Sequence, residues 1–148
     1  MRRRGAIARA VLVAAGVVAL DQVAKAVVRG AIDRGQDVEL ILGVTLTNVR
    51  NSGVAFGLFA GGGALLTVVT VAALVALGGF FAAYAHRPGA WIPIGLLLGG
   101  AAGNLLDRLR QGWVTDFIDL PWWPAFNLAD IAITFGVLSL LLVTNRHG

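Results

Sequence analysis

The sequence predicts an all-α membrane bundle of four transmembrane helices, with a small β segment after the first helix. Of the 148 residues, 57% are hydrophobic and only 14% are charged, which is too apolar for an ordinary soluble domain. Four apolar segments each approach the ~20 residues that a helix needs to cross a bilayer. They cover residues 8–28, 63–85, 91–109 and 126–144 of what we expect to be a single domain, residues 1–148.

The composition also excludes several classes of function. The chain has no cysteine, so it has no disulfide, thiol nucleophile or thiolate metal site. Its two histidines, His86 and His147, have no partner at metal-ligand spacing, and we expect neither a metal nor a cofactor. The net charge is +4, but the basic residues mark the ends of apolar segments and do not alternate with aromatic residues. We therefore expect no nucleic-acid partner.

The first helix is expected over residues 8–28, and arginines set its orientation. Arg2, Arg3, Arg4 and Arg9 lie before it or at its start, which places this end in the cytoplasm by the positive-inside rule. Four crossings then place the C-terminus in the cytoplasm too. A cleavable signal peptide is the alternative, but no small-residue cleavage site precedes the polar loop, so a retained anchor fits better. The asymmetry of positive charge between the two sides is weakened by five arginines on the extracytoplasmic side: Arg29, Arg34, Arg50, Arg108 and Arg110. Three acidic residues accompany them there: Asp33, Asp37 and Glu39.

The loop over residues 29–62 is expected to be extracytoplasmic and partly β. Residues 38–42 and 44–47 are rich in β-branched and aliphatic side chains, and Gly43 between them indicates a turn. The apolar residues 54–59 are too few to span a bilayer. We expect them to lie at the interface or to pack over the helix ends.

Small residues recur on the third helix, which is expected over residues 91–109. Gly95, Gly99 and Gly103 are spaced by four, and this spacing predicts close packing against a neighbouring helix. Tryptophans lie on both sides of the expected membrane and are typical interfacial anchors: Trp91 on one side, and Trp113, Trp122 and Trp123 on the other.

Four aspartates lie where a membrane protein can least accommodate a free charge. Asp21, Asp107 and Asp130 lie inside or at the end of apolar segments, and Asp116 lies in the link between the last two segments. A carboxylate in or next to hydrocarbon is costly, so it is usually buried, paired or used. With a rise of ~1.5 Å per residue along each helix, all four fall on the extracytoplasmic side. Their convergence predicts a polar cavity between the helices.

Some of these polar residues have a structural explanation. Asp21 and Lys25 are four residues apart on one helix face, which favours a buried ion pair. Asn104, Asp107 and Arg108 also share a face. Either a catalytic group or a charge network that ties the third helix to a loop would explain them.

For three asparagines, the sequence leaves open whether the role is functional or structural. Asn48 and Asn51 lie in the first outer loop, where asparagines bind a substrate backbone or simply form turns. Asn127 lies at the start of the fourth helix, where its side chain is suited to capping the helix. Spacing alone does not decide between these roles.

Asp130 is the acid that is hardest to explain by structure alone. The dipole of the fourth helix favours its charge, but it has no basic partner in the sequence. A transporter or proton-conducting bundle would use Asp21, Asp107 and Asp130 as a relay, which predicts acids spread through the membrane depth. A purely structural subunit leaves Asp130 unexplained. Clustering on one side favours an enzyme, although spacing does not choose between Asp116 and Asp119 as its second acid.

Five segments, in order along the chain, resemble the motifs of the bacterial lipoprotein signal peptidase family, also called signal peptidase II. They begin with Asp-Gln-Val-Ala-Lys at residues 21–25 and end with Pro-Ala-Phe-Asn-Leu-Ala-Asp at residues 124–130. Residues 48–57, 103–108 and 114–119 lie between them, so the resemblance covers nearly the whole chain. One motif alone is weak evidence, whereas five motifs in order are highly specific.

The resemblance implies an aspartyl protease of the bacterial plasma membrane, a multi-pass protein whose active site lies near the extracytoplasmic face. Its catalytic pair would be Asp116 and Asp130. The substrate would be a prolipoprotein whose cysteine already carries diacylglyceryl, and cleavage just before that cysteine would free the signal peptide. Membrane lipid and cyclic peptide inhibitors such as globomycin are the other implied partners, and we expect a monomer without a cofactor.

The resemblance also assigns supporting roles. The β segment would be a cradle, residues 56–59 would be a mobile cover, and a change of Asp119 to asparagine would be milder than a change in the catalytic pair. The residues that match positions lining or supporting the site are Asp21, Lys25, Asn48, Asn51, Gly53, Asn104, Asp107, Arg108, Asn127 and Ala129.

Overall fold

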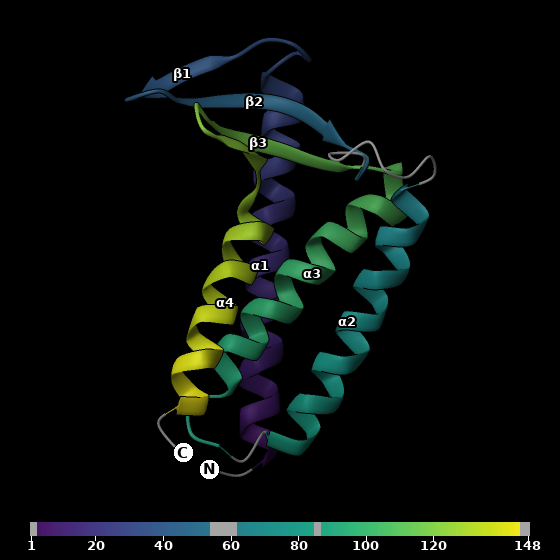
Figure 1. Ribbon diagram of the computed structural model, residues 1–148, viewed down its shortest axis with the longest axis vertical. Coiled ribbons are helices and arrows are strands. Elements are labelled where there is room, and N and C mark those ends of the chain that lie inside the picture. Colours follow the sequence, from purple (N-terminus) through teal and green to yellow (C-terminus); the bar gives the residue numbers. More distant parts are fainter. Residues whose placement is uncertain (1–2, 54–61, 85–86, 146–148) are drawn as a thin grey trace.

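The computed structural model describes residues 3–53, 62–84 and 87–145, which form a helical bundle with a small sheet across one end (Figure 1). The helices end within a few residues of their predicted bounds, because their long apolar runs are local signals. Along the chain the elements are α1 (Arg3–Ala31), β1 (Val38–Ile41), β2 (Val44–Asn51), α2 (Gly62–Tyr84), α3 (Trp91–Gln111), β3 (Val114–Leu120), β4 (Trp123–Phe126) and α4 (Leu128–Asn145).

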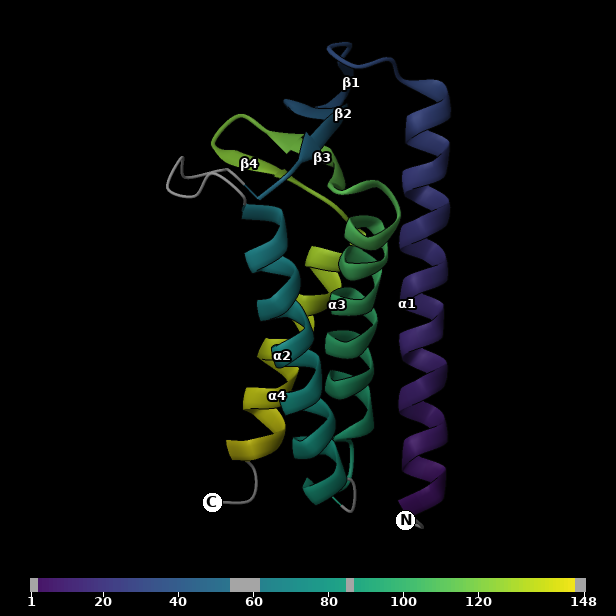
Figure 2. The ribbon, with the colours of Figure 1, turned by 90° about the vertical axis from the view of Figure 1, so that its right-hand side faces the viewer.

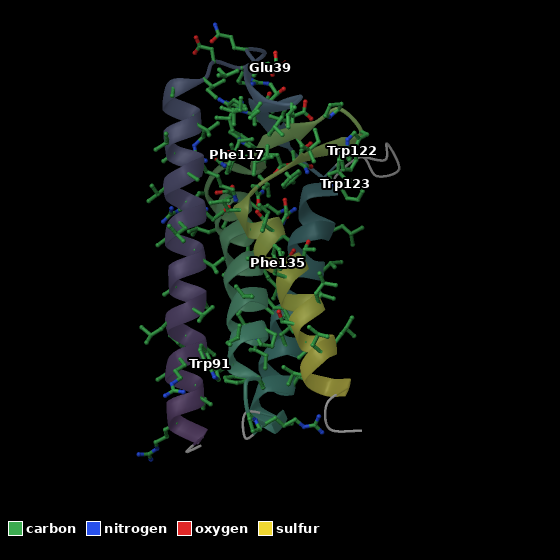
Figure 3. All side chains as sticks on the ribbon, turned by 90° about the vertical axis from the view of Figure 1, so that its left-hand side faces the viewer. Glu39, Trp91, Phe117, Trp122, Trp123 and Phe135 are labelled. Atoms are coloured by element: carbon green, nitrogen blue, oxygen red, sulfur yellow. The ribbon has the colours of Figure 1, made fainter. Side chains whose placement is uncertain are left out.

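Within the described residues, one helical segment, Arg4–Ala31, is both long and apolar enough to cross a bilayer by itself. Thr67–Phe81 and Leu128–Val143 are shorter apolar helices. Figure 3 shows Trp91 toward the end of the bundle far from the sheet, and Trp122 and Trp123 at the sheet end. The tryptophans therefore lie at opposite ends of the bundle, as interfacial anchors would.

The sheet is larger than the sequence predicts. Its four strands are antiparallel in the order β1-β2-β3-β4, so the link before α4 supplies half of it. The sequence predicts strands only after the first helix and a fourth helix from residue 126, whereas β3 and β4 occupy residues 114–120 and 123–126 and α4 begins at Leu128. The difference arises because β3 pairs with β2, a distant part of the chain. The predicted strands and turn of the first outer loop are confirmed, with Gly43 at a φ of 79°. The apolar residues 54–59, which include the predicted cover at 56–59, lie outside the described residues.

The predicted close approach of α3 is confirmed, and its partner is α1. A Cβ added to Gly95 would lie 2.8 Å from the carbonyl oxygen of Ala10, and one on Gly99 would lie 2.8 Å from that of Ala14. A real Cβ essentially never comes so close, so only glycine permits this packing. α3 also packs against α4 and α2, and therefore stands at the centre of the bundle (Figure 2). This arrangement brings the polar upper ends of α1, α3 and α4 together beneath the sheet.

Candidate active site

Asp116 and Asp130 reach the same place from different elements. Asp116 is buried in the middle of β3, where it is paired with Val49 of β2. Asp130 lies in the first turn of α4, directly after the sheet. Asp119 is an odd number of residues from Asp116 on the same strand, and side chains at odd separations point to opposite faces. The alternation along β3 therefore places Asp116, not Asp119, on the face toward Asp130.

Asn127 bridges the two aspartates. Its side-chain Nδ2 donates to Oδ1 of Asp116 at 2.7 Å, and its backbone N–H donates to Oδ2 of Asp130 at 3.2 Å. The backbone N–H of Asp130 returns a bond to Oδ1 of Asn127 at 3.0 Å. This reciprocal pattern is a capping box at the start of α4, so the predicted cap is confirmed. The same residue both begins the helix and fixes the position of the aspartate pair.

Two further amides complete the contacts of the pair. Asn51 Nδ2 donates to Oδ2 of Asp116 at 2.9 Å, and Asn104 Nδ2 donates to Oδ1 of Asp130 at 2.9 Å. Each of the four carboxylate oxygens thus accepts one hydrogen bond from an N–H group without a charge. Neutral donors hold the geometry and leave the pair able to gain or lose a proton.

The pKa of Asp116 is raised to about 6. Burial is the largest cause, because it disfavours the charged carboxylate, and the charge of Asp130 raises the value further. The hydrogen bonds from Asn51 and Asn127 favour the ionised form and act in the opposite direction. Asp116 therefore changes charge close to neutral pH, where a general acid or base is most effective.

A second group of charges, Asp21, Lys25 and Asp107, lies beside the pair and is called the buried ion cluster below. Lys25 is fully buried, and its Nζ is 2.7 Å from Oδ2 of Asp21 and 2.9 Å from Oδ2 of Asp107. A third bond, of 3.0 Å, runs to Oδ1 of Asn104. The three donors of the ammonium group are therefore matched by three acceptors. The predicted Asp21–Lys25 pair is confirmed, and Asp107 is its third member.

The buried ion cluster also holds the backbone just before each aspartate of the pair. Oδ1 of Asp21 accepts the N–H of Ala129 at 3.0 Å, and Oδ2 of Asp107 accepts the N–H of Thr115 at 3.2 Å. Ala129 and Thr115 precede Asp130 and Asp116. The sequence left two explanations open for Asn104, Asp107 and Arg108: a catalytic group or a charge network. These contacts favour a charge network that ties α3 to the following segment.

The buried ion cluster also fixes the orientation of the side-chain amide of Asn104. Because Oδ1 of Asn104 must accept from Lys25, its Nδ2 must face Asp130. Sequence analysis did not single out Gln22, whose Nε2 donates to Oδ1 of Asp107 at 2.9 Å. Its place within the motif at residues 21–25, next to Asp21, is the signal that could have identified it.

The remaining predicted residues have different surroundings. Gly53 has a φ of 82° and donates its N–H to Oδ1 of Asn51 at 2.8 Å, which turns the amide nitrogen of Asn51 toward Asp116. Asn48 instead donates to the carbonyl of Ile32 at 2.9 Å and fastens β2 to the end of α1. Arg108 lies within electrostatic reach of both Asp116 and Asp130, and its buried Nε has no hydrogen-bond partner among the described residues.

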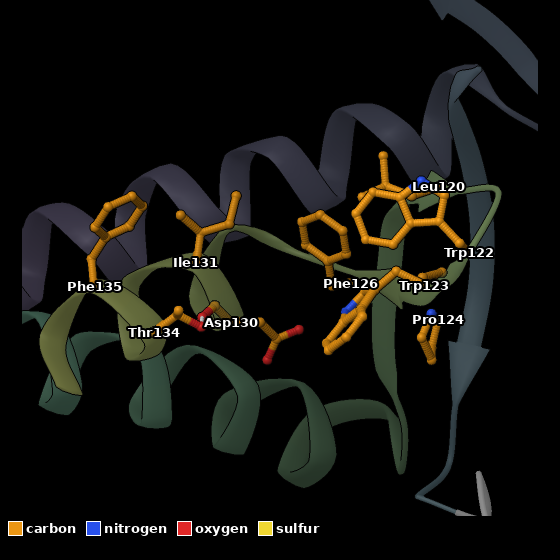
Figure 4. A pocket seen from close by; sticks show the side chains of 10 residues that line it. Leu120, Trp122, Trp123, Pro124, Phe126, Asp130, Ile131, Thr134 and Phe135 are labelled. Atoms are coloured by element: carbon orange, nitrogen blue, oxygen red, sulfur yellow. Dashed lines mark hydrogen bonds between the residues drawn. The ribbon is translucent and has the colours of Figure 1, made fainter. Parts of the chain in front are cut away.

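Two cavities reach the aspartate pair, and another lies along α3 next to Asn104, which contacts Asp130. An apolar one of about 530 Å³ lies between β4 and α4, and Figure 4 shows Asp130 among the side chains of Trp123, Phe126 and Phe135. A second, of about 370 Å³, lies between α2, α3 and α4, with polar side chains of α3 at its edge, Asn104 and Arg108. The third, of about 280 Å³, is lined by residues that include Asn51, Ser52 and Asp116. The described residues contain no group of three or more His, Cys, Asp or Glu side chains placed to hold a metal ion.

Comparison with known proteins gives a consistent result. A family model described as signal peptidase (SPase) II matches residues 13–146. The lipoprotein signal peptidase of Moorella thermoacetica is 43% identical over 143 residues, which cover 93% of this chain and 95% of the relative. That of Syntrophomonas wolfei is 42% identical over 133 residues, or 89% of each chain.

Solved structures agree with the sequence relatives. A bacterial membrane enzyme determined by the in meso method at 2.3 Å resolution superposes with a TM-score of 0.85 and 34% identity, over 95% of this chain and 89% of the other. A second, at 1.9 Å resolution, gives a TM-score of 0.81 and 31% identity over 93% of each chain. The family match extends over nearly the whole length of the chain, and the chain therefore belongs to the signal peptidase II family.

Proposed function

We propose that this chain is an intramembrane aspartyl endopeptidase that removes the signal peptide from diacylglyceryl-modified prolipoproteins, cutting before the lipidated cysteine. Asp116 and Asp130 are its catalytic pair. The observation that carries this proposal is the bridge through Asn127, which donates to one oxygen of each aspartate. Family membership supports the substrate class, because the relatives are named lipoprotein signal peptidases.

In the proposed mechanism the pair shares one proton near neutral pH, since two adjacent carboxylates do not both ionise easily. The ionised member takes a proton from a water molecule, and the water oxygen attacks the scissile carbonyl carbon. The protonated member gives its proton to the carbonyl oxygen. The tetrahedral intermediate then collapses, its C–N bond breaks, and the leaving nitrogen receives a proton from the pair.

The cavities suggest how the substrate lies. The polar cavity beside Asn51 and Asp116 suits the peptide around the cleavage point. The two cavities that flank α4 are mainly apolar and suit the apolar parts of the substrate, its acyl chains and the signal sequence. Arg108 lines one of them, its buried Nε has no hydrogen-bond partner in the part of the chain that the structure describes, and it would bind a substrate carbonyl.

The membrane arrangement follows from the same residues. We infer that residues 1–148 form one domain whose four helices cross the bacterial plasma membrane, with both termini cytoplasmic and the sheet on the extracytoplasmic face. The arginines at the N-terminal end of α1 and the tryptophans at both ends of the bundle support this orientation. The enzyme would act as a monomer among membrane lipids, without a cofactor, and cyclic peptides such as globomycin would compete with the substrate.

The test is cleavage of a diacylglyceryl-modified prolipoprotein by the purified protein in detergent, read as a mass shift. The wild type should release the signal peptide, and Asp116→Asn and Asp130→Asn should release none while remaining folded and inserted. Asp119→Asn is the matched control, since it makes the same chemical change on β3 at a position facing away from the pair. Full cleavage by either of the first two variants would refute the assignment.

A further inference from the structure

A basic pocket lies at the sheet end of α1. Its volume is about 190 Å³, and it gathers three arginines from the end of α1, the following loop and β2: Arg29, Arg34 and Arg50. Asp33 is the single acid among its lining residues, so three positive charges and one negative charge leave a net charge of +2. It shares Arg50 with the polar cavity beside Asp116 but contains neither catalytic aspartate.

Two of the three guanidinium groups are held in place by neutral partners. Arg29 Nη1 donates to Oγ1 of Thr115 at 3.0 Å, and the guanidinium carbon of Arg50 lies 4.0 Å from the ring centroid of Trp113. Stacking on a ring uses the face of the guanidinium and leaves its N–H groups free at the edge. Within the described residues, no carboxylate forms an ion pair with any of the three arginines.

The position of these arginines has no topological explanation. In the proposed orientation they lie on the extracytoplasmic side, where the positive-inside rule disfavours them. Arg29 lies in the last turn of α1, where the helix dipole favours a positive charge. This explanation does not reach Arg34 and Arg50, which lie outside the helix.

The chemistry of the pocket fits one kind of ligand. Guanidinium groups present forked N–H donors that match phosphate oxygens, and a pocket of net positive charge without a paired carboxylate attracts an anion. The pocket lies beside Trp113 at the outer end of α1, which is the depth of lipid headgroups in the proposed orientation. We propose that the basic pocket binds the phosphate group of an anionic membrane lipid in the extracytoplasmic leaflet. The proposal rests on the membrane orientation given under the proposed function.

The experiment measures phospholipid binding directly. The full-length protein, purified in detergent, is titrated with phosphatidylglycerol or with phosphatidylcholine, and bound lipid is counted by native mass spectrometry. The wild type should prefer phosphatidylglycerol. The double variant Arg34→Gln with Arg50→Gln should lower the affinity for phosphatidylglycerol about tenfold or more, because hydrogen bonds to charged groups are strong.

The matched control is Arg4→Gln with Arg110→Gln, which removes the same charge at exposed arginines outside the pocket. It should change the affinity less than about twofold, because neither Arg4 nor Arg110 lines the pocket. Equal losses in the two double variants, or no preference for phosphatidylglycerol in the wild type, would overturn the proposal. Competition by millimolar inorganic phosphate would assign the pocket to soluble phosphate and so contradict the lipid. Binding is read without cleavage, so failure here leaves the proposed protease activity standing.

Discussion

Two groups of aspartates lie side by side at the sheet end of the bundle, and they are stabilised in opposite ways. In the buried ion cluster, Asp21 and Asp107 are both bonded to the ammonium group of Lys25. In the proposed catalytic pair, Asp116 and Asp130 receive their hydrogen bonds from asparagines. The first group is thus bonded to a full positive charge, and the second group is bonded to neutral amides. Under the proposed function, this contrast separates the acids that support the site from those that perform the chemistry.

The two groups of aspartates are nevertheless connected through the backbone. The carboxylates of the buried ion cluster bond the backbone N–H groups of Thr115 and Ala129, the residues directly before Asp116 and Asp130. Lys25 is the single lysine of the chain, and each of its three donors is used. The buried charges are costly to remove from water, and their hydrogen bonds hold two distant segments of the chain in position. The comparison predicts that damage to the first group reduces stability and that damage to the second changes chemistry.

The largest effect on stability is expected from Lys25→Met. Removing the ammonium group leaves Asp21 and Asp107 buried without a cation, and breaking a buried ion pair from one side typically costs about 3–5 kcal/mol. The variant should unfold at a markedly lower temperature or denaturant concentration in detergent. Its residual folded fraction should cleave substrate slowly, because Asn104 loses its bond from Lys25.

Arg4→Met is the control for this change, since it removes a positive charge from an exposed position on the same helix. It should unfold like the wild type. A Lys25→Met protein as stable as the control would contradict the role of the buried ion cluster.

A smaller effect, on pH dependence alone, is expected from Asn51→Leu. The hydrogen bond from Asn51 stabilises the ionised form of Asp116 and so lowers its pKa. Its loss should raise the pKa of Asp116 above the value of about 6. The shared proton would then be retained to higher pH, and the basic limb of the kcat/KM profile should move up by about one pH unit.

Asn48→Leu makes the same replacement on the same strand and is the matched control. Asn48 bonds the carbonyl of Ile32, so its loss should leave both limbs of the profile where they are. A shift of the Asn51→Leu profile to lower pH would show that the amide does not favour the ionised carboxylate.

Sequence reasoning succeeded where the signal was local. The helices follow from apolar runs, the Asp21–Lys25 pair follows from a spacing of four residues, and the cap at Asn127 follows from its place before a helix. Each of these features is settled within a turn or two of the chain. The glycines of α3 likewise predicted a close neighbour, although they could not say that the neighbour is α1.

The features that sequence reasoning missed depend on distant partners. β3 contains two aspartates and β4 contains Pro124, and these residues obscure the strand pattern. β3 is stabilised by pairing with β2, which is separated from it in the sequence by α2 and α3. Asn51 and Asp116 are 65 residues apart, so their bond is invisible to spacing. Identification of Asp116 rather than Asp119 therefore came first from the resemblance, and the strand geometry supplies its physical reason.

Asp116 and Asp130 are proposed to act as a unit, and a double-mutant cycle under single-turnover conditions measures whether they do. Cleavage of a lipidated prolipoprotein by excess enzyme is timed for the wild type, Asp116→Asn, Asp130→Asn and the double variant. If the two aspartates act together, each single change should slow cleavage by about 10³-fold or more, and the double change should be no worse than either. Single variants that each retain substantial activity, with losses that multiply in the double variant, would contradict it.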